Sequence, residues 1–257
     1  MFDIIEFQKA AQAVGLYAGK LDGVPGPKTQ TAAMAFKPVI DDIIAFIPKP
    51  IKFRYEKIAQ THVLRADPMD LRAAVAGKKP GEIPQQTFVN ANFFSGQNVI
   101  GWLISEGKVI RERHEDIKYP GWAGNVKGTF IVYKDGTVEA GWKYDSEITR
   151  VVDNIWFCCQ GFNLFPPNMT VWQGIDKEGF AQATGRTTTR LAIGYDGKDA
   201  VIAIRPDSDA PRIAATMTNL GCKDRAIGLD SGSPATFRKE GEMIIEGKET
   251  LQAIIYL

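Results

Sequence analysis

The sequence has little of the residues that disulfide and metal chemistry need. Among 257 residues there are three cysteines and two histidines. Cys158 and Cys159 are adjacent, so their Cα atoms lie about 3.8 Å apart, which is too close for an ordinary disulfide. Cys222 adds no regular spacing, and neither His62 nor His114 is near a cysteine pair. We therefore expect no disulfide framework, no metal site and no cofactor, with at least one thiol in the core.

Long apolar runs and an excess of charge are also absent. The most apolar stretch, Val39–Ile47, contains two aspartates and falls short of the ~20 residues that cross a bilayer. Met1-Phe2-Asp3 lacks the basic and apolar regions of a signal peptide. With 31 basic and 30 acidic residues, the net charge of +1 gives no reason to expect nucleic acid or an anionic membrane as partner.

Residues 1–47 are predicted to form a small helical module. Apolar residues recur at helical spacing from Ile4 to Val14, and a second helix is expected to begin near Pro27. A further apolar helix is expected to end at Ile47. Residues 48–52 contain Pro48-Lys49-Pro50, which predicts a stiff linker.

Residues 53–257 show mainly the pattern of strands. The expected strands are Phe53–Ala59, Thr87–Ala91, Val99–Ile104, Lys108–Arg111, Thr129–Tyr133, Thr137–Ala140, Asn154–Cys159, Arg190–Tyr195, Ala200–Arg205, Ala226–Leu229, Met243–Ile245 and Gln252–Leu257. Asp135-Gly136 and Asp196-Gly197 lie between apolar runs and predict hairpin turns. Helices are expected over Pro68–Val75 and Ala210–Leu220. The fold class is therefore α+β, with a large, mainly antiparallel mixed sheet and few helices, preceded by the small all-α module.

The N-terminal module carries a turn-rich signature between its first two helices. It contains Gly15-Leu16-Tyr17, Leu21-Asp22-Gly23 and Gly26-Pro27-Lys28-Thr29, and Phe36 closes it. In this combination the module resembles the short three-helix peptidoglycan-binding domain. The resemblance implies wall binding through Tyr17, Asp22 and Gly23. The sequence departs from the family after Phe36, and the alternative is that Asp22-Gly23 only forms a turn in a packing module.

Three short segments of the larger domain combine polar groups with strand ends. Asn90-Ala91-Asn92-Phe93-Phe94 closes a strand, so its two amides can point to one side and bind sugar hydroxyls beside an aromatic ring. Arg186 and Arg190 precede an apolar strand at a spacing that places both guanidinium groups on one face, which suits a phosphate diester. Ile227-Gly228-Leu229-Asp230-Ser231-Gly232-Ser233 delivers a carboxylate into a turn of small residues. Each segment alone has an ordinary structural explanation.

Together and in this order, the three segments resemble the phosphodiester glycosidase family. This family includes an enzyme that removes N-acetylglucosamine from a phosphodiester on mannose. Its motifs are Asn-x-x-Phe-Phe, Arg-Thr-Ala-Ile-Gly and Leu-Asp-Gly-Gly-Gly-Ser. The matching positions are Asn90, Phe93, Phe94, Arg190, Ala192, Ile193, Gly194, Leu229, Asp230, Gly232 and Ser233. Leu191, Ser231 and Pro234 depart from the family pattern.

The resemblance implies a role for each motif. Arg190 and Asp230 would be catalytic: Arg190, with Arg186, would stabilise the phosphate, and Asp230 would act as nucleophile or base. The substrate would be bound by residues from all three motifs, namely Asn90, Asn92, Phe93, Phe94, Arg186, Ser231, Gly232 and Ser233. A second carboxylate is left open among Asp153, Asp176 and Asp207.

The leading hypothesis is a hydrolase that cleaves a sugar of the N-acetylglucosamine type from a phosphodiester. Its N-terminal module would target it to bacterial cell-wall glycan, as in a wall-active protein of phage or prophage origin. It would stay in the cytoplasm until lysis releases it, or be part of a virion. The alternative is a non-catalytic wall-binding or virion protein that keeps the glycosidase fold. A third hypothesis, a peptidoglycan amidase or peptidase, is disfavoured because the sequence lacks the histidine, cysteine or metal groups that such enzymes normally use.

Overall fold

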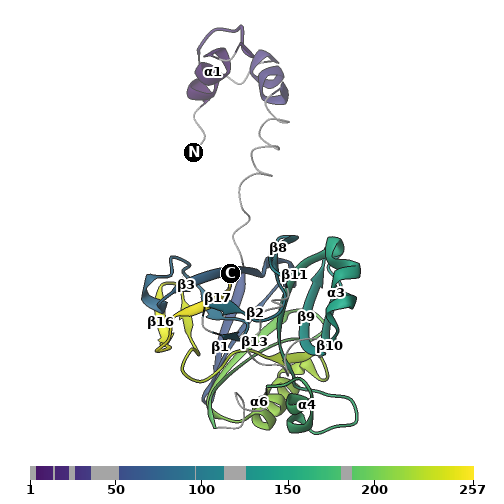
Figure 1. Cartoon of the computed structure of the whole chain (residues 1–257). Helices are drawn as coiled ribbons and strands as arrows, with labels where there is room; N and C mark the ends of the chain where they lie inside the picture. Colours follow the sequence, from purple (N-terminus) through teal and green to yellow (C-terminus); the bar gives the residue numbers. More distant parts are fainter. Residues whose placement is uncertain are drawn as a thin grey trace. The chain divides into compact units, whose positions relative to one another are not determined.

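A computed structural model describes residues 4–13, 15–22, 27–35, 52–95, 97–112, 126–180 and 187–257 (Figure 1). The chain divides into two compact units, Met1–Pro50 and Ile51–Leu257. Several positions named above lie outside the described residues: the expected helix ending at Ile47, and Gly23, His114 and Arg186.

The N-terminal unit contains two short helices that share a small core. Helix α1 spans Ile4–Ala13, residues 27–35 form the second helix, and Ala11, Tyr17 and Ala32 are buried between them. Gly15 follows α1 with a φ of 77°, a left-handed conformation that glycine adopts without strain. The predicted positions of both helices agree with this structure.

The second unit consists of two main sheets and a two-stranded ribbon, and every strand pair that the structure describes is antiparallel. The larger sheet has the order β1-β2-β13-β12-β14-β11-β7-β8, with β9 beside β11 and β10 beside β9. Its strands are β1 (Phe53–Ile58), β2 (Thr61–Ala66), β7 (Leu103–Ser105), β8 (Lys108–Arg111), β9 (Lys127–Tyr133), β10 (Val138–Lys143), β11 (Ile155–Asn163), β12 (Thr188–Tyr195), β13 (Ala200–Ser208) and β14 (Ala226–Gly228).

The smaller sheet has the order β16-β15-β4-β17-β3. Its strands are β3 (Arg72–Lys78), β4 (Phe88–Asn90), β15 (Phe237–Lys239), β16 (Glu242–Ile245) and β17 (Leu251–Tyr256), and the ribbon is formed by β5 (Phe94–Ser95) and β6 (Asn98–Val99). The main hydrophobic core takes residues from both sheets and lies between them.

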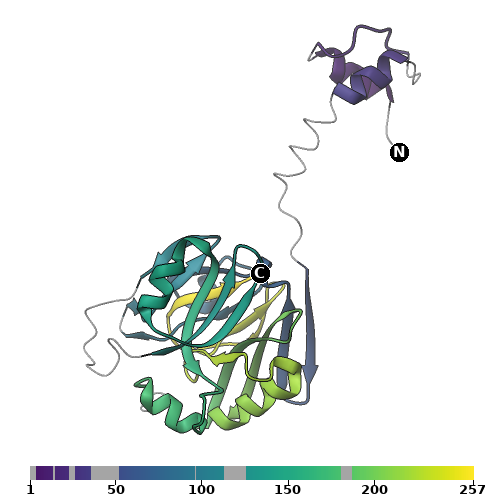
Figure 2. The ribbon, with the colours of Figure 1, turned by 90° about the vertical axis from the view of Figure 1, so that its right-hand side faces the viewer.

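The opposite face of the larger sheet is covered by helices, as Figures 1 and 2 show. Helix α6 (Ala210–Met217) packs on β12 and β13 and lies beside α4 (Val171–Lys177). Helix α3 (Asp145–Val151) contributes Ile148 to a third cluster. The predicted α+β class, with large antiparallel sheets and few helices, is confirmed. None of the helices in the described ranges is both long and apolar enough to cross a membrane.

All three cysteines are free and buried, whereas the sequence predicted only that at least one thiol lies in the core. Successive side chains of a strand point to opposite faces. Cys158 accordingly belongs to the hydrophobic cluster that contains Ile148 of α3, and Cys159 belongs to the core between the two sheets.

Two predicted elements are wrong. Instead of a helix over Pro68–Val75, Pro68–Asp70 forms one 3-10 turn and β3 begins at Arg72. Pairing of β3 with β17 outweighs the helical preference of the alanines in this segment. The predicted strand Val99–Ile104 is interrupted because Gly101 has a φ of 80° and the Trp102 amide donates to a side chain, Gln160, at 2.8 Å.

Close backbone approach fixes the centre of the larger sheet. A Cβ added at Gly161 would lie 1.9 Å from the Gly228 carbonyl oxygen, and one added at Gly228 would lie 2.1 Å from the Phe162 ring. Strands β11 and β14 can therefore meet here only because both positions are glycine.

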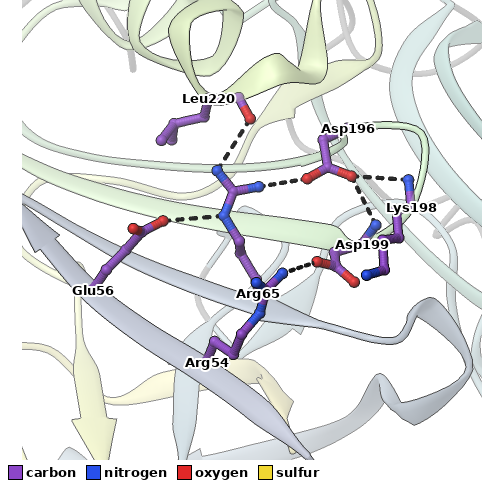
Figure 3. Close-up of polar contacts among 7 residues, drawn as sticks. All are labelled: Arg54, Glu56, Arg65, Asp196, Lys198, Asp199 and Leu220. Atoms are coloured by element: carbon purple, nitrogen blue, oxygen red, sulfur yellow. Dashed lines mark hydrogen bonds and ion pairs between the residues drawn. The ribbon is translucent and has the colours of Figure 1, made fainter.

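A group of charged side chains connects β1, β2 and the β12–β13 turn (Figure 3). Arg65 forms ion pairs with Glu56 at 3.0 Å and Asp196 at 2.5 Å, and it donates to the Leu220 carbonyl at 3.2 Å. Arg54 pairs with Asp199. These contacts are satisfied within the fold, and we assign this cluster a structural role at the C-terminal end of the α6 segment.

Candidate functional site

The strand register brings the predicted catalytic pair together. Strands β12 and β14 pair with Ala192 opposite Gly228, and the Leu229 amide donates to the Leu191 carbonyl at 2.9 Å. Arg190 and Asp230 are the next residues of the two chains, and beyond them the pairing shifts by one residue, since the Gly232 amide donates to the Thr189 carbonyl at 2.9 Å. The charge of each of the two groups acts on the pKa of the other. The two residues, 40 positions apart in sequence, therefore lie in one site.

Asp230 is a buried carboxyl group at the end of β14. It is 9% exposed, and its Oδ1 accepts a hydrogen bond from the Ser231 amide at 2.9 Å. Burial is the main cause that raises the pKa of Asp230, and the negative charge of Glu249 adds to it, whereas the Ser231 amide and the Arg190 charge lower it; together they bring the pKa to about 8. Near neutral pH this carboxyl group therefore carries a proton more often than not.

Arg190 is the largest fully buried side chain in the described part of the chain, with 0% exposure. Burial lowers its pKa, while the charges of Asp209 and Asp230 raise it. Asp209 is the N-cap residue of α6, so the helix brings a second carboxylate toward the guanidinium group. The arrangement combines a fixed cation with a carboxyl group that can hold or release a proton, which is a pair suited to acid–base chemistry beside a developing anion.

The amide of Asn90 holds the loop that follows Asp230. Its Nδ2 donates to the Asp230 carbonyl at 2.6 Å, and its Oδ1 accepts from the Thr236 amide at 2.9 Å. Asn90 is 2% exposed. Both ends of this side chain are thus used to position the backbone on which Asp230 lies, and contact with a sugar hydroxyl stays a prediction.

The side chain of Asn92 likewise forms its hydrogen bonds with backbone groups. Its Nδ2 donates to the carbonyls of Ile100 and Trp102, at 3.1 and 2.9 Å, and its Oδ1 accepts from the Gln160 amide at 3.3 Å. Gln160 continues this buried network by donating to Thr129 Oγ1 at 3.0 Å. Motif reasoning did not identify Gln160, because an amide in the middle of an apolar strand has no distinctive neighbours in sequence.

The other predicted binding residues have different surroundings. The Phe93 ring packs on Phe180, with centroids 4.7 Å apart, and is 5% exposed, whereas Phe94 is half-buried. Ser231 Oγ donates to the Leu229 carbonyl at 2.8 Å. Gly232 has a φ of 82°, and Ser233 is exposed. Of the predicted set, Ser231, Gly232 and Ser233 therefore lie beside Asp230, while Phe93 belongs to the hydrophobic core.

A second buried carboxylate, Glu178, was missed by sequence analysis. It follows α4 and is fully buried; its oxygens accept from Trp142 Nε1 at 2.6 Å and from the amides of Asn163 and Gly128 at 2.9 and 2.7 Å. Burial raises its pKa to about 7, although these three donors and the Lys127 charge act to lower the pKa. Because the carboxylate accepts from β9, β10 and β11 together, we assign it a structural role.

Replacing Glu178 with glutamine is expected to lower the free energy of unfolding by ~1–3 kcal/mol, since one N–H donor would then face the new amide group. Urea denaturation followed by circular dichroism measures this change. Glu246→Gln, at an exposed position, is the matched control and should unfold with the wild type. Unchanged stability of Glu178→Gln would contradict the structural role.

In the N-terminal unit the predicted wall-binding residues make internal contacts. The Tyr17 hydroxyl donates to the Lys20 carbonyl at 2.7 Å, and the Tyr17 ring is 6% exposed. The Asp22 amide donates to Gln8 Oε1 at 3.2 Å, and Asp22 Oδ1 accepts from Gln8 Nε2 at 3.2 Å. Gln8 therefore ties the turn to α1.

Comparison with known proteins identifies the fold. No family model and no curated protein matches the sequence. Among solved structures, the zebrafish N-acetylglucosamine-1-phosphodiester alpha-N-acetylglucosaminidase catalytic domain, auto-inhibited by its pro-peptide, is similar with a TM-score of 0.61 and 15% identity. The match covers 82% of this chain and 84% of the zebrafish chain.

A protein of Burkholderia pseudomallei is similar with a TM-score of 0.57 and 10% identity, over 77% of this chain and 73% of the other. The larger unit thus has a phosphodiester glycosidase-like fold. In the part of the chain that the structure describes, no three histidine, cysteine, aspartate or glutamate side chains converge as metal ligands.

Proposed function

We propose that the protein is a hydrolase that removes a sugar of the N-acetylglucosamine type from a phosphodiester. The observation that carries this proposal is that Arg190 and Asp230 directly adjoin the bonded pair Leu191 and Leu229 on a glycosidase-like fold. In a sugar 1-phosphodiester the leaving group is a stable phosphate anion. The site has to supply positive charge for that anion and a carboxyl group near the anomeric carbon.

Asp230 and Arg190 have complementary roles in this proposal. The raised pKa of Asp230, about 8, makes the group a proton donor to the departing phosphate near neutral pH. This role differs from that of the nucleophile or base that the family resemblance implies. Arg190 supplies positive charge to the same region. Its full burial requires that covering groups move before a phosphate contacts it directly.

The proposal is tested by incubating the purified protein with a synthetic N-acetylglucosamine 1-(methyl phosphate) diester and measuring free N-acetylglucosamine. Release of sugar and methyl phosphate supports the assignment. Absence of release from this compound and from a panel of other sugar 1-phosphodiesters would overturn it.

The second candidate is a non-catalytic wall-binding or virion protein with the same fold. Two observations favour it: the complete burial of Arg190, and the substitutions Leu191, Ser231 and Pro234 around the pair. Under this alternative the protein would bind cell-wall glycan without releasing sugar. The hydrolysis assay separates the two candidates.

The N-terminal unit is proposed to target the protein to bacterial cell wall, on the strength of its turn-rich signature. Purified peptidoglycan is expected to retain the full chain in a pull-down better than a chain that begins at Lys52, because the shorter chain lacks the module. Circular dichroism of the shorter chain checks that it is folded. If peptidoglycan retained both folded chains equally, the targeting role would be contradicted and the module would have only a packing role.

A further inference from the structure

The loop between β16 and β17 lies directly against the loop that follows Asp230. The Lys248 amide donates to the Ser233 carbonyl at 2.8 Å, and the Gly247 amide donates to Thr236 Oγ1 at 3.2 Å. A Cβ at Gly247 would lie 2.4 Å from Thr236 Oγ1 and 2.8 Å from the Pro234 carbonyl oxygen. This contact therefore fixes how residues 246–250 sit beside the Asp230 loop.

Glu249 is the next residue of this docked loop, and it is exposed. In the described part of the chain no hydrogen bond or ion pair holds its carboxylate. Its negative charge nevertheless reaches Asp230 and raises the pKa of that group. Glu249 and Arg190 are the charged groups that act on Asp230, whereas Asp153, Asp176 and Asp207, the carboxylates left open by the sequence, are not among them.

The position of Glu249 affects the ionisation of Asp230. A carboxylate beside a buried carboxyl group disfavours ionisation of the latter. Two carboxyl groups with different environments are the usual arrangement of an acid and a base in one site: the buried member keeps its proton and the exposed member is ionised. Asp230 is buried and Glu249 is exposed, so their environments differ in this way.

We propose that Glu249 is the second carboxyl group of the active site and accepts the proton of the attacking water. This inference rests on the proposed function. In the step, the water oxygen forms a bond to the anomeric carbon and the bond from that carbon to the phosphate oxygen breaks. The water gives a proton to Glu249, and Asp230 gives its proton to the departing phosphate. Solvent then restores both protonation states, and no other reactant is needed.

Glu249→Gln is expected to lower kcat for the N-acetylglucosamine 1-(methyl phosphate) diester at least about 100-fold, the usual contribution of a general base. Glu246→Gln, in the same exposed loop, is the matched control and should retain wild-type turnover. A Glu249→Gln variant as active as the control would overturn the inference and leave the proposed function intact.

A second measurement does not depend on turnover. The pKa of the Asp230 carboxyl group, followed by ¹³C NMR in the full chain, should fall in Glu249→Gln and stay unchanged in Glu246→Gln. An unchanged value in Glu249→Gln would overturn the pairing, even for a protein that hydrolyses no phosphodiester. With active protein, water attacking opposite the phosphate also requires the first free sugar to have inverted configuration, and retention would overturn the base role.

Discussion

Asp230→Asn is expected to lower kcat/KM for a sugar 1-phosphodiester on the order of a thousandfold or more, since each ~1.4 kcal/mol of lost transition-state stabilisation is tenfold. Asparagine keeps the shape of the side chain but has no proton to give to the departing phosphate. The rate of sugar release under subsaturating substrate measures the change. Asp224→Asn, at an exposed position shortly before β14, is the control and should behave as the wild type.

The same variant is expected to be more stable than the wild type at alkaline pH. The Asp230 pKa is 3.8 for the ordinary group and about 8 in the folded protein. Between these values the folded state holds a proton that the unfolded state has lost, so the free energy of unfolding falls as pH rises. The asparagine side chain of the variant does not titrate in this range. The melting temperature of the variant should therefore exceed that of the wild type at pH 8 but not at pH 4.

This pair of measurements separates lost chemistry from lost structure. An inactive variant with a higher melting temperature at pH 8 supports a functional role for Asp230, because the group then costs stability and is needed for turnover. An Asp230→Asn variant with wild-type activity would contradict the proposed role.

Arg190→Met is expected to lower kcat/KM for the phosphodiester about 100- to 1,000-fold, as expected when one group that stabilises a developing anion is removed. Methionine fills much of the buried volume but carries no charge. The loss should be smaller for an N-acetylglucosamine substrate with a neutral leaving group, because less charge then develops beside Arg190.

Arg205→Met is the matched control for this experiment. Arg205 lies opposite Arg190 on β13 but donates to Thr216 Oγ1 of α6 at 2.8 Å, which assigns it to helix packing. Its variant should keep activity close to the wild type. Equal losses in both arginine variants, or none in Arg190→Met, would contradict a specific role for Arg190.

The proposed catalytic pair was accessible to sequence reasoning because Arg190 stands near the start of a recognisable apolar strand and Asp230 follows the end of another. The fold class followed from the same alternation of strands and turns. The environment of the pair was not accessible in this way. The partners of Asn90 and Asn92 are backbone groups, which carry no sequence signal. No sequence motif surrounds Glu178, and the sequence around Glu249 is that of an ordinary charged surface turn.

Short helices were missed for a related reason. Helices α3 and α4 each have seven residues, too few for apolar periodicity to stand out. A capping signal was present at α4, where the Gln173 amide donates to Thr170 Oγ1 at 3.3 Å in a capping box. The predicted helix over Pro68–Val75 failed because strand pairing with β17, a contact distant in sequence, determined the outcome.

The close approach of β11 and β14 limits how the protein can be redesigned. Gly228 lies two residues before Asp230, and neither Gly228 nor Gly161 on the neighbouring strand has room for a side chain. A mutational library aimed at new substrates would yield mostly unfolded chains at these positions. Variation at Glu246, Lys248 and Thr250 avoids that constraint, whereas Gly247 and the proposed base Glu249 have to stay. The loop that carries Glu249 is therefore the natural place for laboratory evolution of substrate preference.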